Sequence, residues 1–173
     1  NAIIHYGNSG RFEDVSDCLK EMKELYMKNP NDVAEKLSSG LSNSIAYYGI
    51  IGQSEHVSNC LKQMREIYTK NPNDMAKEFA KGLNNAIIGY SSAERFDDMS
   101  DCLKEMRELF LTHPEDVAKG LANCLIIAIN YYNTVGRFDD LSNCLKEIKE
   151  LYMKHPKYVA EEFTKVILVY GVI

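Results

Sequence analysis

Four cysteines are the residues of this chain whose type and spacing first suggest chemistry, because thiolates bind metal ions and thiols form disulfides. They stand 42 residues apart each time, at Cys18, Cys60, Cys102 and Cys144. Equivalent positions of stacked helices lie about 8 to 10 Å apart, beyond the Cα separation of about 7 Å that a disulfide tolerates. No CxxC or Cys/His spacing typical of zinc accompanies them. We therefore interpret them as small buried residues in a reducing compartment.

The remaining polar residues predict no catalytic centre. No histidine stands beside a nucleophile, no carboxylate pair is set apart from the charged helix faces, and the sequence has no phosphate loop. His56 lacks any Cys/His or Asp partner pattern, so we interpret it as neutral variation. We predict that the protein is not an enzyme and holds no cofactor and no metal.

The same 42-residue period governs the rest of the chain. The four prolines repeat at that spacing, and the segment from Cys18 to Tyr26 recurs three more times in register. Self-similarity at a fixed period is typical of stacked repeats, in which each unit contacts only its neighbours. We predict a single repeat array over residues 1–173, with units at 1–42, 43–84, 85–126 and 127–168 and with residues 169–173 ending a truncated last helix.

Each period predicts two helices, an A helix after the proline and a B helix before the next one. From Val15 to Tyr26, apolar residues recur at the spacing of one helix face, and Pro30 then ends this B helix. Gly40 and Gly82 fall inside A helices, where glycine costs about 1 kcal/mol relative to alanine. We therefore expect a neighbouring helix to approach closely at these two glycines.

The turns from A to B helices predict a left-handed cap. Gly10, Gly52 and Gly136 stand at the end of their A helices, and glycine adopts this conformation freely. Glu94 replaces the glycine of the third turn, and Ser54 replaces the aromatic residue of the second. We expect these two connections to be the most irregular.

Neither end of the sequence resembles the polar capping unit with which solenoids usually end. We expect either that the chain is excised from a longer array or that its ends stack on other copies. No signal peptide is visible, and no apolar run reaches the length of about 18 residues that a membrane span needs. We predict a cytoplasmic protein without membrane contact.

These residues resemble the tetratricopeptide repeat family. Asn43 and Tyr48 match the asparagine and tyrosine of that family's helix A, Gly52 matches its turn glycine, and Pro72 matches its closing proline. The resemblance covers the whole chain, and the unit is longer than the usual 34 residues, as in the lengthened 42-residue class. It implies an all-α, right-handed α-solenoid of antiparallel helix pairs with about nine helices. Ile45 and its equivalents are larger than the family's small residue there, so we expect an altered superhelix.

The resemblance also implies a non-enzymatic scaffold that binds a peptide or partner surface in a concave groove lined by A helices. Asparagine side chains there could hold extended backbone, because amides both donate and accept hydrogen bonds; mere solvent tolerance at these positions is an equal alternative. A self-associating array, stacked end to end through its uncapped terminal repeats, is the alternative function. The predicted groove residues are Ser39, Ser42, Ala46, Ile50, Lys81, Asn84, Ile88, Ser91, Asn123, Ile126, Asn130, Asn133 and Thr134.

Charge argues against a nucleic-acid partner. The net charge is −5 and the sequence pI is about 5.4, whereas binding to a phosphate backbone needs clustered Lys and Arg. An RNA-recognising helical repeat is the alternative that this acidic balance disfavours, and salt-sensitive RNA binding would restore it. The predicted partner is a protein or peptide, with no nucleic acid and no membrane.

Overall fold

The computed structural model describes residues 2–171, and all regular structure in that range is helical. The helices are α1 (Ala2–Asn8), α2 (Phe12–Lys28), α3 (Pro30–Ile50), α4 (Ser54–Lys70), α5 (Pro72–Ser92), α6 (Phe96–Thr112), α7 (Pro114–Thr134), α8 (Phe138–Lys154) and α9 (Pro156–Tyr170). The prediction of an all-α array of about nine helices is confirmed for the described residues. The right-handed superhelix stays a prediction.

The prolines set the register of the helices. Each of Pro30, Pro72, Pro114 and Pro156 begins an A helix, and the preceding B helix ends two residues earlier. Proline is favoured at the first helical position because its fixed φ suits the helix and its missing N–H has no intrahelical partner there. The predicted unit boundaries at 42/43, 84/85 and 126/127 fall inside α3, α5 and α7, and this division of the chain stays a prediction.

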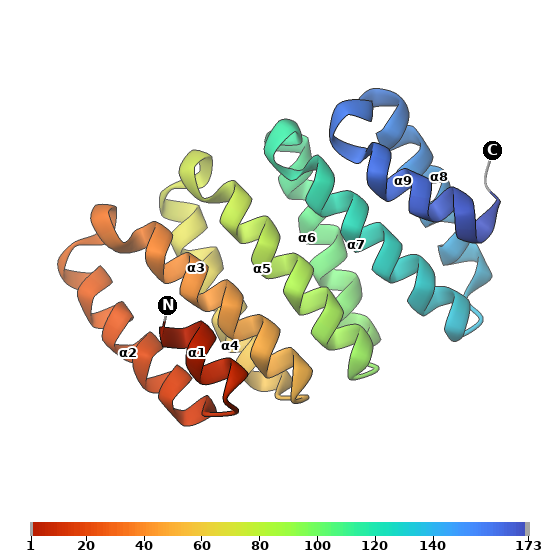
Figure 1. Cartoon of the computed structure of the whole chain (residues 1–173). Coiled ribbons are helices and arrows are strands. Elements are labelled where there is room, and N and C mark those ends of the chain that lie inside the picture. Colours follow the sequence, from red (N-terminus) through yellow and green to blue (C-terminus); the bar gives the residue numbers. More distant parts are fainter. Residues whose placement is uncertain (1, 172–173) are drawn as a thin grey trace.

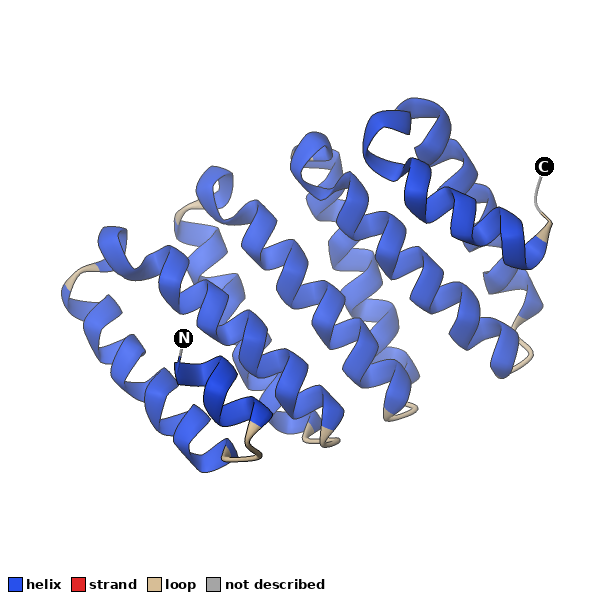
Figure 2. Cartoon of the chain, viewed as in Figure 1, coloured by secondary structure: helices blue, strands red, loops and turns tan. Residues whose placement is uncertain are grey.

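The helices form two layers (Figure 1). The A layer contains α1, α3, α5, α7 and α9, and the B layer contains α2, α4, α6 and α8, with short loops between them (Figure 2). The apolar stripes of both layers meet in a continuous core, in which Leu41 and Leu125 are fully buried. Cys60, Cys102 and Cys144 are also buried, as predicted, and Cys18 is half-buried.

The glycines inside the A helices make room for side chains of the preceding repeat. A Cβ atom on Gly82 would lie 2.5 Å from the Met64 sulfur, and one on Gly40 would lie 2.9 Å from Ile3. Close packing at these positions is therefore confirmed. The packing partners are side chains of neighbouring helices, and Cys124, at the equivalent place in α7, is fully buried.

The predicted irregularity is absent from the third connection, at Glu94. The second connection, at Ser54, does differ from the others, because Ser54 N–H donates to the Gly52 carbonyl and His56 N–H donates to the Gln53 carbonyl, both at 3.0 Å. Glu94 takes a left-handed conformation with φ of 55°, close to the 71° of Gly52 and the 74° of Gly136. The same hydrogen bond closes each turn: Arg95 N–H donates to the Tyr90 carbonyl at 2.9 Å. The repeat imposes this turn even on a residue with a Cβ atom, because both flanking helices are held by their packing.

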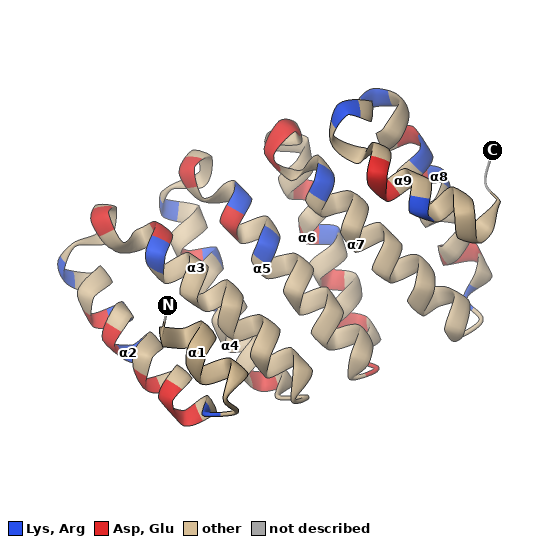
Figure 3. Ribbon diagram, viewed as in Figure 1, with Lys and Arg blue, Asp and Glu red and all other residues tan. Residues whose placement is uncertain are grey.

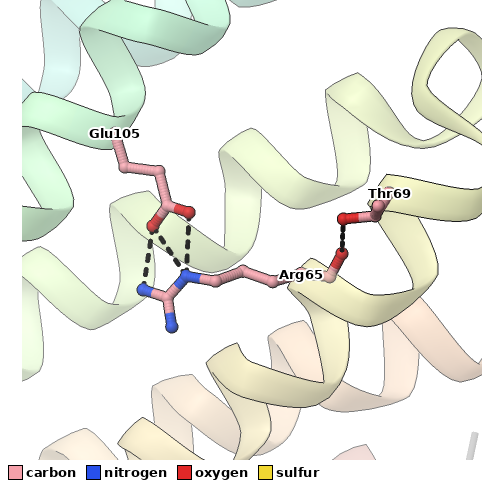
Figure 4. A network of polar contacts seen from close by, with 3 residues as sticks. All are labelled: Arg65, Thr69 and Glu105. Atoms are coloured by element: carbon pink, nitrogen blue, oxygen red, sulfur yellow. Dashed lines mark hydrogen bonds and ion pairs between the residues drawn. The ribbon is translucent and has the colours of Figure 1, made fainter.

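Ion pairs connect successive B helices. The Arg65 guanidinium of α4 donates to both carboxylate oxygens of Glu105 on α6, with N–O distances of 2.8 to 3.0 Å (Figure 4). One repeat later, Arg107 binds Glu147 in the same way. These long side chains bridge helices whose backbones are not in direct contact.

Candidate ligand-binding face

The solvent-facing surface of the A layer lies on the side toward which the array curves. Successive A helices approach with Cα atoms within 8 Å, whereas no two B helices within residues 2–171 do so. A double layer with one closely spaced side bends toward that side. We therefore infer that α1, α3, α5, α7 and α9, which run side by side in Figure 1, line the concave face.

Charge divides this face into two halves. The last charged residue of α3 is Lys36, that of α5 is Lys81 and that of α7 is Lys119. From these lysines to its end, each helix carries only uncharged residues, and the corresponding ribbons are free of blue and red in Figure 3. Across α3, α5 and α7, the face therefore has a charged half at the helix N-termini and an uncharged half at the C-termini.

Four of the predicted groove residues meet around one cavity. Ser42, Lys81, Asn84 and Asn123 line a space of about 360 Å³ between α3, α5 and α7, here called the Gly120 pocket. Its other lining residues are Asn43, Lys77, Ala80, Asn85, Asp116, Lys119 and Gly120.

Three more predicted residues, Ala46, Ile50 and Ile88, line a smaller hollow of about 190 Å³ between α3 and α5. Its floor is the close approach of two glycines, since a Cβ atom on Gly89 would lie 2.9 Å from the Gly49 Cα. Only residues without a side chain allow α3 and α5 to pack at this distance.

The other predicted residues line neither cavity. Ser39, Ser91 and Ile126 are half-buried, and Asn130, Asn133 and Thr134 are exposed on the last turns of α7. The Asn130 side-chain oxygen accepts a hydrogen bond from the Tyr170 hydroxyl at 2.9 Å, so α9 already uses it.

Ser42 is less available than the sequence suggested. It is 4% exposed, and its backbone carbonyl accepts a hydrogen bond from the Asn85 side-chain amide at 2.9 Å. Asn85 thus joins α3 to α5, and it lines both cavities.

Sequence reasoning missed the lining residues of the Gly120 pocket that lie nearer the helix N-termini. Lys77 lies one turn before Lys81, and Lys119 and Asp116 lie one and two turns before Asn123. Continuing the spacing of three or four residues toward the helix N-termini would have found them, because that spacing keeps side chains on one helix face.

Two of the three lysines that line the pocket form ion pairs. Lys81 pairs with Glu78 of its own helix, and the Lys119 ammonium lies 3.4 Å from a Glu162 oxygen on α9. Within the described part of the chain, neither Lys77 nor Asp116 has an oppositely charged group within 4.0 Å. Lys77 is therefore the cation of the pocket that is available to a ligand.

The described residues hold no cluster of three or more His, Cys, Asp or Glu side chains that could bind a metal ion. Between residues 2 and 171, every helix is too short or too polar to span a bilayer.

Comparison with known proteins identifies similarity to one repeat family. The PPR repeat matches residues 2–27 and 83–109. The first stretch covers α1 and nearly all of α2, and the second covers the end of α5 and most of α6, so each contains the last part of an A helix, the turn and a B helix. No curated protein and no solved structure matches the chain. The chain is a helical-repeat protein, and the tetratricopeptide-like 42-residue class stays a prediction.

The exclusion of a nucleic-acid partner was wrong. PPR repeats typically bind RNA, and they recognise about one base per repeat through two or three side chains. Such recognition depends on a few side chains in each repeat, so the net charge of −5 does not decide it.

Proposed function

We propose that the chain is a binding scaffold that holds an extended peptide along the concave A-layer face, across α3, α5 and α7. One observation carries this proposal: the C-terminal halves of these three neighbouring helices contain no charged residue (Figure 3), and each helix has an asparagine near its middle, where the uncharged half begins. A peptide backbone presents a donor and an acceptor at each residue, and an asparagine amide can satisfy both.

The two cavities support a linear ligand. Both lie on the same face, and Asn85 lines each of them. A chain that fills one can therefore continue into the other. The apolar lining of the smaller hollow, with Ile50 and Ile88 both exposed, suits an apolar side chain of such a peptide.

The test is a selection of random peptides displayed on phage, followed by calorimetry with synthetic peptides. Ile88→Lys places a charge in the uncharged half of the A-layer face. Leu111→Lys is the matched control, since Leu111 is 80% exposed on α6 of the opposite layer. We expect the first variant to lose peptide binding and the second to retain it. Loss with Leu111→Lys alone would place the site on the B layer and refute the proposal.

Single-stranded RNA is the second candidate ligand, because the PPR match favours it. The same two variants distinguish it when they are titrated with random single-stranded RNA 20-mers at 50 and 200 mM salt. Binding that weakens steeply with salt and is changed by Ile88→Lys but not by Leu111→Lys would establish RNA as the ligand of this face. The predicted end-to-end self-association stays a prediction, which sedimentation at increasing concentration checks.

A further inference from the structure

The next interface along the array, between α7 and α9, contains a carboxylate at the place that is open in the Gly120 pocket. Lys119 on α7 faces Glu162 on α9, and the Glu162 side chain is 2% exposed. Counting back 42 residues, Lys77 on α5 takes the place of Lys119, and Gly120 on α7 takes the place of Glu162. Where one interface contains a buried carboxylate against a lysine, the preceding interface therefore contains a cavity against a lysine.

Packing does not explain the glycine at this position. A Cβ atom on Gly120 would lie 3.7 Å from both Ala80 and Met106, which is ordinary van der Waals contact. Gly82 differs, since Met64 occupies the space of its missing side chain. Glycine is among the least favourable residues for a helix interior. At this position the absence of a side chain leaves an open cavity.

The groups around this cavity suit a single carboxylate. Lys77 has no ion-pair partner among the described residues, and the side-chain amides of Asn84 and Asn123 supply further donors. Lys81 and Lys119 also line the cavity, each already paired with glutamate. Asp116 is the one acidic group of the lining, and it opposes a ligand with more than one negative charge.

We propose that the Gly120 pocket binds the carboxylate of a glutamate or aspartate side chain of the bound peptide. This inference depends on the proposed peptide-binding function. The ligand carboxylate takes the place against Lys77 that Glu162 takes against Lys119. Because Asn85 connects this pocket to the smaller hollow, the acidic side chain fixes the register of the peptide along the face.

The experiment uses peptides selected by the whole chain, resynthesised with an acetylated N-terminus and with either a free or an amidated C-terminus. In each, the acidic residues are replaced one at a time by glutamine or asparagine. A hydrogen-bonded charge pair lost in this way weakens binding about tenfold, so one replacement in each peptide should have that effect, whether the C-terminus is free or amidated.

Variants of the protein test the pocket directly. Lys77→Gln should weaken binding of the acidic peptide about tenfold and should abolish the preference for glutamate over glutamine. Gly120→Glu supplies the missing carboxylate from the protein itself and should block the acidic peptide, whereas Gly120→Ala, which leaves most of the cavity open, should bind as wild type. Asp116→Asn removes a like charge and should strengthen binding severalfold.

Four results would overturn the inference. Peptides that depend on Ile88 but are insensitive to the glutamine replacements and to Lys77→Gln would refute the acidic anchor and leave the proposed peptide-binding function standing. Loss of binding on C-terminal amidation alone would identify a terminal carboxylate as the occupant. RNA binding that Gly120→Glu abolishes would identify a phosphate. If the wild-type chain selects no peptide at all, the peptide-binding function itself fails, and this inference with it.

Discussion

Replacing Glu94 with glycine should stabilise the protein. Glu94 is the one non-glycine residue with positive φ among the described residues, at 55°, and Gly10, Gly52 and Gly136 hold the equivalent turns at 70° to 74°. A left-handed conformation costs a residue with a Cβ atom about 1 to 2 kcal/mol. Glycine also gives the unfolded chain more conformational freedom, which lowers the free energy of unfolding by about 0.4 to 1 kcal/mol and offsets part of that gain. The net gain expected for Glu94→Gly is about 1 kcal/mol.

The repeats supply both controls. Gly136→Glu introduces the same strain into the fourth turn and should destabilise by about 1 kcal/mol. Glu94→Ala removes the exposed carboxylate but keeps the Cβ atom, so its stability should stay within a few tenths of a kcal/mol of wild type.

Urea denaturation followed by circular dichroism measures these differences as shifts of the unfolding midpoint at a constant m value. A midpoint that rises equally for Glu94→Gly and Glu94→Ala would show that the carboxylate, and not the backbone, causes the effect. An unchanged midpoint for both Glu94→Gly and Gly136→Glu would show that these turns carry no conformational strain.

Three further predictions follow from single interactions. A double-mutant cycle on Arg65 and Glu105, each changed to alanine, should give a coupling free energy of about 1 kcal/mol that falls with added salt, because the pair is bidentate but only partly buried. A coupling free energy of zero would show that the ion pair does not stabilise the contact between α4 and α6. Tyr26→Phe should leave stability unchanged or raise it by up to about 1 kcal/mol in thermal melts, because the buried Tyr26 hydroxyl has no hydrogen-bond partner within the described residues. Burial raises the pKa of Cys60 and of Cys102 from 9.0 to about 12, so both thiols should resist a disulfide reagent at pH 8 until the protein unfolds. Because these thiols lose their protons at lower pH in the unfolded chain than in the folded protein, the urea midpoint should fall as pH rises above about 9. The fall should be less steep in Cys60→Ala.

Local sequence patterns were enough to predict the helices and their stacking. The spacing of apolar residues from Val15 to Tyr26 identifies a helix face, and Pro30 and its equivalents mark where each A helix begins. The burial of Cys60 and the close packing at Gly82 follow from the same pattern. The helix faces depend on residues within a few turns of one another, and the stacking depends on the exact 42-residue repeat, so the sequence alone contains both.

The Gly120 pocket and the strained turn depend on the tertiary structure. The pocket exists because α3, α5 and α7 are spaced by side chains some 40 residues apart, and the equivalence of Gly120 with Glu162 has meaning only once α9 is seen to place a carboxylate against Lys119. Glu94 adopts the glycine conformation because the packing of both flanking helices outweighs its local preference. The periodic sequence specifies the unit, whereas differences of single residues at the interfaces between units decide where the array is closed and where it is open to a ligand.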